Sequence, residues 1–100
     1  MAYGYVATMR TTAGNRDEVV GLLVSGATGL REAGCQVYVV SVVDDDPHLI
    51  HVTEVWDSKE HHDASLQLPE AKAAIAKAMP LLTGEFTRQE LTVVGGLGVS

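Results

Sequence analysis

The order in which two hydrophobic periodicities alternate along this 100-residue chain limits its fold more than any other feature. Alternation with a period of two is typical of strands, and repeats at i, i+3, i+4 and i+7 are typical of amphipathic helices. The order found here predicts an α+β, ferredoxin-like β-α-β-β-α-β domain with a four-stranded antiparallel sheet. The predicted strands are Ala2–Thr11, Cys35–Val43, Leu49–Trp56 and Glu85–Val94, and helical patterns run from Asn15 to Ala33-Gly34 and from Lys59 to Pro80.

Both predicted helices begin with residues that suit an N-terminal cap. Asn15 is followed three positions later by Glu18, and Asp57 is followed by Glu60, which is the spacing of a capping box. The second helical segment contains Leu68-Pro69, where the helix is expected to break and to restart with proline in its first turn.

Composition excludes several classes of partner. The formal net charge is −6, and the seven basic residues are scattered, which argues against binding to nucleic acid or to an anionic membrane surface. No apolar run reaches the roughly 20 residues that span a bilayer, and no signal-peptide pattern is found. We expect one cytoplasmic domain over residues 1–100, with a flexible tail at residues 95–100. The single cysteine, Cys35, lies in an apolar strand and is expected to be a buried hydrophobic residue rather than a reactive thiol.

The predicted sheet has one face that its own helices do not cover. In a β-α-β-β-α-β fold both helices pack on the same face, so the other face should be polar. The strand Cys35–Val43 is instead apolar on both faces, and the next strand places Leu49 and Val55 opposite Ile50 and Trp56. The sequence therefore predicts a homodimer in which a second copy packs sheet against sheet.

The segment Leu49–Leu66 contains the only tryptophan and three of the four histidines. Trp56 and Glu54 point to the same side of the strand as Ile50 and Val52. Trp56 is either a core anchor or a flat wall for an aromatic ligand. Glu54 is either at a solvent-exposed edge, paired with a base such as Arg88, or part of a pocket.

His61 and His62 lie in the first turns of the second helical segment. The positive end of the helix dipole favours neutral imidazole there, and a neutral histidine can accept a proton from a substrate hydroxyl. Because adjacent helical residues are about 100° apart, at most one of the two is expected to face inward.

The sequence contains no recognised cofactor or metal motif. There is no His-x-x-x-His pair, and no cluster of histidines and carboxylates has the spacing of metal ligands. The glycines at 95, 96 and 98 have no helix after them and do not form a phosphate-binding loop. We therefore predict no metal and no cofactor, so that any chemistry would depend on the electrons of the substrate.

The segment Thr53–Leu66, which reads T-E-V-W-D-S-K-E-H-H-D-A-S-L, and the alanine-rich helix started by Pro69 resemble the antibiotic biosynthesis monooxygenase family, specifically its small quinol-monooxygenase-like members. This resemblance implies a dimeric α+β barrel with a pocket between the sheet and the helices of each subunit. It also implies oxygenation of quinols, anthrones and similar electron-rich aromatics by O2, without metal, flavin or haem.

The resemblance also assigns roles to residues. Trp56 would line the pocket, His62 would hydrogen-bond or deprotonate the substrate hydroxyl, and Arg88 would steady the resulting anion. The other substrate-binding candidates are Tyr5, Val52, Glu54, His61 and Met79.

The chain departs from the family pattern at two positions. Val52 stands where aromatic-oxidising members carry an asparagine, and the first strand lacks the asparagine of haem-degrading relatives. The sequence therefore leaves three alternatives to the monooxygenase hypothesis. They are a non-catalytic dimeric barrel that binds a small molecule, a haem-degrading enzyme, and isomerase or dehalogenase-type chemistry.

Overall fold

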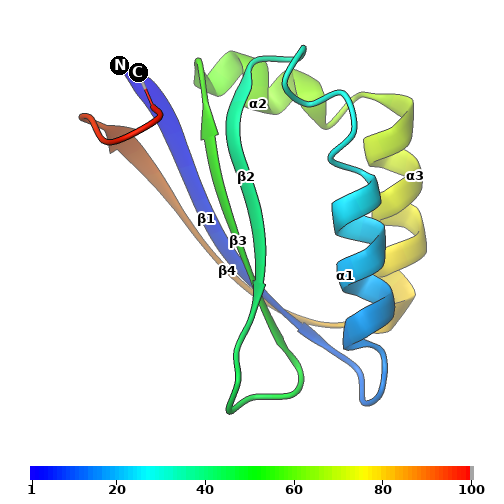
Figure 1. Ribbon diagram of the computed structural model, residues 1–100. Helices are drawn as coiled ribbons and strands as arrows, with labels where there is room; N and C mark the ends of the chain where they lie inside the picture. Colours follow the sequence, from blue (N-terminus) through cyan, green and yellow to red (C-terminus); the bar gives the residue numbers. More distant parts are fainter. Residues whose placement is uncertain (100) are drawn as a thin grey trace.

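The computed structural model describes residues 1–99 as one antiparallel sheet with all its helices on one face (Figure 1). The strands lie in the order β2-β3-β1-β4. This arrangement confirms the predicted α+β, ferredoxin-like fold. The elements are β1 (Ala2–Thr11), α1 (Arg16–Ser25), β2 (Cys35–Val42), β3 (Leu49–Trp56), α2 (Lys59–Ser65), α3 (Pro69–Ala78), the 3-10 turn η1 (Met79–Leu81) and β4 (Leu82–Val93).

The first helix is shorter than its hydrophobic pattern predicts. It ends at Ser25, and residues 26–34 form turns. Gly29 and Gly34 have φ angles of 86° and 102°, which a right-handed helix does not contain. Asn15 is the N-cap residue, as predicted, but the predicted capping box is wrong, because the Asn15 side chain bonds to Thr12 Oγ1 instead of to the helix.

The second helical segment is broken as predicted, with Pro69 in the first turn of α3. Its predicted cap is wrong by one residue. Ser58 is the N-cap, and its hydroxyl accepts a hydrogen bond from the backbone N–H of His61. Asp57 instead accepts a bond from the Gln36 amide.

The last strand begins at Leu82, three residues before the predicted Glu85. Two features account for the earlier start. The 3-10 turn η1 leads the chain directly into the strand, and Gly84 takes a φ of 92° that most residues avoid.

Strand register decides which side chains face the helices. Tyr5 on β1 lies opposite Glu54 on β3 and Glu90 on β4, while Tyr38 on β2 lies opposite Glu54 from the other side. These four side chains therefore form one row across the sheet. The next two rows along the strands are Val40, Val52, Ala7 and Arg88, followed by Val42, Ile50, Met9 and Phe86.

Two buried clusters lie beneath the helices. One is formed by Val19, Ile50, Val52 and Ala78, and the other by Leu30, Cys35 and Trp56. Burial raises the pKa of Cys35 to about 11, so its thiol stays protonated at neutral pH. This confirms the prediction of a buried hydrophobic cysteine.

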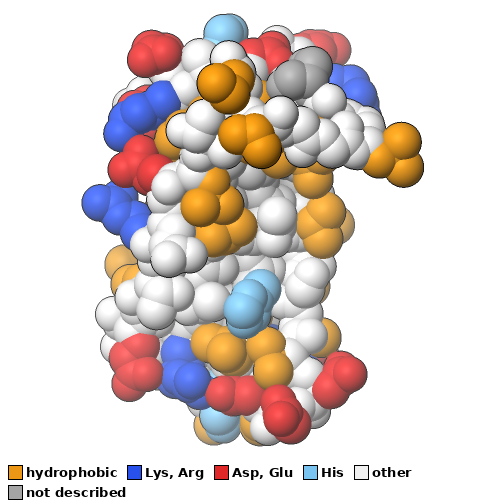
Figure 2. All heavy atoms as spheres, turned by 90° about the vertical axis from the view of Figure 1, so that its left-hand side faces the viewer, with side chains coloured by type: hydrophobic (Ala, Val, Ile, Leu, Met, Phe, Trp, Pro, Cys, Tyr) orange, Lys and Arg blue, Asp and Glu red, His pale blue; other side chains and the backbone are white. Residues whose placement is uncertain are grey.

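The opposite face of the sheet is open. Figure 2 shows hydrophobic side chains over the middle of this face and most charged side chains toward its margins. The register places Val39 and Leu91 there, both about half exposed. Among residues 1–99, no helix is long and apolar enough to cross a membrane. Toward one end of this face lie Arg10 on β1 and Leu49 on β3, and Arg10 forms an ion pair of 3.1 Å with Glu85 on β4. The strand residues in the middle of the face are Gly4, Val6 and Thr8 on β1, Val37, Val39 and Ser41 on β2, His51, Thr53 and Val55 on β3, and Thr87, Gln89 and Leu91 on β4.

Candidate functional site

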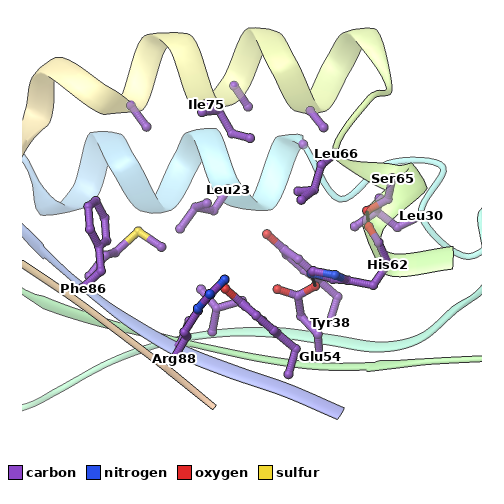
Figure 3. Close-up of a pocket in the computed structure, with 18 of the residues that line it drawn as sticks. Leu23, Leu30, Tyr38, Glu54, His62, Ser65, Leu66, Ile75, Phe86 and Arg88 are labelled. Carbon is purple, nitrogen blue, oxygen red and sulfur yellow. Dashed lines mark hydrogen bonds and ion pairs between the residues drawn. The ribbon is translucent and has the colours of Figure 1, made fainter. Parts of the chain in front are cut away.

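A cavity of about 640 Å³ lies between the sheet and the helices (Figure 3). The first row of the sheet gives it a polar end, where His62 from α2 meets Glu54 and Tyr38. The third row gives it an apolar end, where Phe86 from β4 faces Ile75 from α3. An amphipathic ligand therefore fits this space in one orientation.

His62 is the histidine that faces the cavity, with only 7% of its surface exposed. Its ring stacks on Tyr5 with centroids 4.7 Å apart and lies 5.4 Å from Tyr3. The Trp56 indole meets it edge-on at 5.7 Å. His61 is exposed and lies outside the cavity, with its ring nitrogen bonded to Ser58, so only one of the two histidines faces inward, as predicted.

The hydrogen bond of His62 to Asp63 determines which ring nitrogen is free. Nδ1 lies 3.0 Å from Asp63 Oδ1, and an ionised carboxylate can only accept, so Nδ1 is the donor. In neutral imidazole the other nitrogen, Nε2, then keeps its lone pair. Nε2 lies 4.0 Å from Glu54 Oε1, which is too far for a hydrogen bond and leaves Nε2 able to accept a proton from a ligand.

Glu54 belongs to the pocket and not to an ion pair with Arg88. Its Oε1 accepts a hydrogen bond of 2.8 Å from Trp56 Nε1. Burial raises the pKa of Glu54, and the Trp56 N–H and nearby His62 partly oppose that rise. Of the three places that the sequence left open for Glu54, the structure shows the pocket. Trp56 is both a core residue, 1% exposed, and part of the cavity wall.

A bridge of three residues, which sequence reasoning missed, closes the polar end. Lys59 Nζ lies 2.7 Å from Glu90 Oε2, and the Tyr3 hydroxyl donates to the same oxygen over 2.9 Å. Burial and the Glu90 carboxylate raise the pKa of Tyr3 to about 12. Tyr3 could have been found from its place two residues before Tyr5, whereas no local pattern connects Lys59 with Glu90.

Tyr38 was also missed as a site residue. Burial, followed by the charge of Glu54, raises its pKa to about 12, so its hydroxyl is protonated at neutral pH. The alternation of side chains along β2 indicates only that Tyr38 faces the same side of the sheet as Val40. Its place beside Glu54 depends on a register shift between Cys35 and Val37.

The remaining candidates are distributed along the cavity. Tyr5 and Val52 lie on its floor, Arg88 lies one row beyond Tyr5, and Met79 contributes to the apolar end. Val52 is buried and offers no polar group to the cavity, in line with the departure from the family pattern noted in the sequence. Among residues 1–99, no three His, Cys, Asp or Glu side chains are grouped as a metal ion would require.

Comparison with known families agrees with this geometry. The sequence model of the antibiotic biosynthesis monooxygenase family matches residues 2–77. The chain belongs to this family. No curated protein matches the chain.

Comparison with solved structures covers the whole chain of this family member. A candidate antibiotic biosynthesis monooxygenase from Chloroflexus aurantiacus is 43% identical, with a TM-score of 0.90 and complete coverage of both chains. A candidate from Caulobacter crescentus is 23% identical, with a TM-score of 0.85 over 94% of this chain and 91% of its own. A Mycobacterium tuberculosis protein is 19% identical, with a TM-score of 0.82 over 97% and 99% of the two chains. The latter two likenesses support the fold alone.

Proposed function

We propose that this family member is a cofactor-independent monooxygenase that uses O2 to oxidise a phenolic, quinol or anthrone-type aromatic. The observation that supports this most directly is the His62 ring, which is held by Asp63 and leaves Nε2 as an acceptor inside an aromatic cavity. Phenols are weak acids, and a base aimed at the hydroxyl makes the electron-rich anion available.

In the proposed reaction, His62 Nε2 takes the proton of the substrate hydroxyl. Glu54, 4.0 Å away, stabilises the imidazolium that forms. The phenolate gives one electron to O2, and the resulting radical and superoxide recombine through a new C–O bond. The His62 imidazolium returns its proton to the peroxide anion, and the hydroperoxide then loses water to give the quinone, so one oxygen atom enters the product, the other leaves as water and His62 is neutral again.

The cavity walls would orient the ring during these steps. Tyr5, stacked on His62, and Trp56, edge-on to the same ring, form the aromatic wall of the polar end. Tyr3 and Tyr38 keep their hydroxyl protons at neutral pH, since both pKa values are about 12. The hydroxyl proton of Tyr3 is already donated to Glu90, so Tyr38 is the tyrosine proposed to donate a hydrogen bond to a second oxygen of a quinol. Such fixed donors stabilise developing negative charge without reorganisation.

Oxygen uptake with a panel of hydroquinones and anthrones, in buffer treated with a chelator, tests this proposal. His62→Ala should lower the rate by about 10² to 10⁴. The matched control is His61→Ala, which removes the neighbouring imidazole outside the cavity and should leave the rate within about threefold.

Absence of uptake above buffer for every substrate would reject the proposal, as would equal rates for the His62→Ala variant and the parent. Saturable quenching of Trp56 fluorescence by an aromatic that is recovered unchanged would instead support the non-catalytic alternative. Because Trp56 is the only tryptophan, its emission reports on the cavity directly. A missing Soret shift on titration with haemin would argue against the haem-degrading alternative.

We also propose that the working form is a homodimer in which the open face of the sheet is covered by a second copy. The twelve strand residues in the middle of that face include no Lys, Arg, Asp or Glu, and Arg10, toward one end of it, is paired with Glu85 over 3.1 Å, which suits a surface buried in an interface. The strand β4 supports the same proposal, because every residue from Thr83 to Thr92 is exposed in the single chain. Long exposed edge strands are normally covered or blocked.

A further inference from the structure

Arg88 is an exposed residue of β4 that lines the cavity between its polar and apolar ends (Figure 3). Arg88 pairs with Ala7 across β1, one row beyond the pair of Tyr5 with Glu90. Figure 3 shows its side chain rising from the sheet toward the helices, between the polar group around His62 and the apolar group around Phe86. The small side chain of Ala7 beside it leaves space on the floor of this row.

Arg88 has no partner of its own in the described part of the chain. No hydrogen bond or ion pair forms between it and any of residues 1–99. Glu90 feels its charge, but that carboxylate is already bound by Lys59 and Tyr3. Lys59, the other cation that lines the cavity, is thus neutralised, and Arg88 is left to meet a ligand.

The acidic groups of the cavity restrict where a ligand anion can lie. Glu54 in the first row would repel an anionic substituent there, and Glu90 in the same row is already paired with Lys59, so that this row offers no free cation. The third row, with Met9, Ile50 and Phe86, has no polar side chain to solvate an anion. The second row, at Arg88, is the favourable place for a negative charge.

The spacing of the rows limits the shape of the ligand. Two residues along a strand span about 6.6–6.8 Å. A ligand with one substituent over the first row, where Tyr5 stacks on His62, and another over the second row at Arg88 would bridge about this distance, which is close to that between the para substituents of one aromatic ring. A carboxylate matches the planar fork of a guanidinium and can bind it through two hydrogen bonds.

We propose that Arg88 recognises a carboxylate, so that the substrate is a phenol or quinol acid whose carboxylate lies across the ring from the reacting hydroxyl. This inference rests on the proposed function, because it takes from it that the substrate hydroxyl binds at His62. It differs from the sequence-based expectation, in which Arg88 steadies the phenolate. Arg88 is here a specificity residue that binds a substituent and fixes which hydroxyl meets His62.

The test compares 3,4-dihydroxybenzoate with 3,4-dihydroxybenzamide, which differ in charge but hardly in size. Dissociation constants are measured without oxygen by quenching of Trp56 fluorescence, so the result does not depend on turnover. We expect the parent to bind the acid about ten- to a hundredfold more tightly than the amide.

Arg88→Met keeps much of the side-chain length without the charge and should bring the ratio of the two constants close to one. Arg88→Lys should keep only part of the preference, because an ammonium does not form the paired hydrogen bonds. The control Lys77→Met removes one exposed positive charge from α3, outside the cavity, and should leave the ratio unchanged.

Equal binding of acid and amide by the parent, or a preference that survives in Arg88→Met, would overturn the inference. Oxygen uptake measured in parallel separates it from the proposed function. If neutral hydroquinones are oxidised equally by the parent and Arg88→Met and the acid is not preferred, the carboxylate inference fails and the monooxygenase proposal stands. If the acid binds through Arg88 but no substrate consumes oxygen, the monooxygenase proposal fails and carboxylate recognition stands.

Discussion

Trp56 Nε1 donates a hydrogen bond to Glu54 Oε1 over 2.8 Å, which joins an indole and a carboxylate two residues apart on the same strand. Both side chains face the cavity, and the Glu54 side chain is only 11% exposed. A carboxylate in such a place needs a fixed donor, because losing water disfavours its charged form. The pair therefore places negative charge next to His62 without a cation between them.

Glu54→Gln should change how stability depends on pH. Since burial raises the pKa of Glu54 above its ordinary value of 4.5, the folded state binds this proton more tightly than the unfolded state. Its contribution to stability is present at acid pH and is lost as the pH rises through the folded-state pKa. The unfolding free energy of Glu54→Gln relative to the parent should thus rise with pH above 4.5, by at most about 1.4 kcal/mol per pH unit.

Denaturant unfolding over a pH series measures this difference, and Glu90→Gln is the control with the opposite sign. The bonds from Lys59 and Tyr3 hold the pKa of Glu90 below its ordinary value. Its contribution is therefore present at neutral pH and lost as the pH falls, and the Glu90→Gln difference should decline as the pH rises through the acid range. A Glu54→Gln difference that is flat or declining would contradict the expectation.

Asp63→Asn should lower the oxidation rate by favouring the wrong tautomer of His62. The asparagine amide can donate to Nδ1, which would place the ring proton on Nε2 and remove the base. Because Asp63 is 56% exposed and water can replace it, we expect a loss of about tenfold, smaller than for His62→Ala. The control is Glu60→Gln, which removes a charge from the same helix without touching His62. Both variants are compared by steady-state oxygen uptake. Equal losses of rate in the two variants would show that the tautomer argument is wrong.

Gly34→Ala should destabilise the protein more than Gly29→Ala. Both glycines have positive φ angles, 102° and 86°, which cost a substituted residue about 1–2 kcal/mol. A Cβ at Gly34 would also lie 2.7 Å from His61 Cδ2, whereas a Cβ at Gly29 meets nothing within 4 Å. The added crowding should cost about 1–3 kcal/mol more, measured by chemical denaturation. Equal losses would show that His61 moves aside freely.

Val39→Glu should dissociate the proposed dimer. Val39 lies on the open face of the sheet, and a glutamate there would bury an unpaired charge from each copy. The dimer dissociation constant should rise at least about a hundredfold. Light scattering coupled to size-exclusion chromatography measures this, with Ala76→Glu on the exposed side of α3 as a variant that stays dimeric. A parent chain that is monomeric at high concentration would contradict the dimer.

The sequence by itself determined the order of strands and helices and the side of β3 on which Trp56 and Glu54 lie. Both follow from local periodicity, because successive strand residues point to opposite faces whatever else the chain does. The restart of the helix at Pro69 is equally local, since proline fixes its own φ and lacks an N–H. That at most one of His61 and His62 faces inward is local too, because adjacent residues of a helix point about 100° apart.

Only the tertiary structure decided which histidine that is, and which groups surround it. The bond between Tyr3 and Glu90 joins residues 87 positions apart, and that between Lys59 and Glu90 spans 31 positions. Such contacts depend on strand register and on how α2 lies over the sheet, which no local pattern encodes. The end of α1, the hydrogen bonding of Asn15 and the identity of the second cap were missed for a related reason. Glycines with positive φ end α1, the Asn15 side chain bonds to Thr12, and Ser58 rather than Asp57 accepts from the helix.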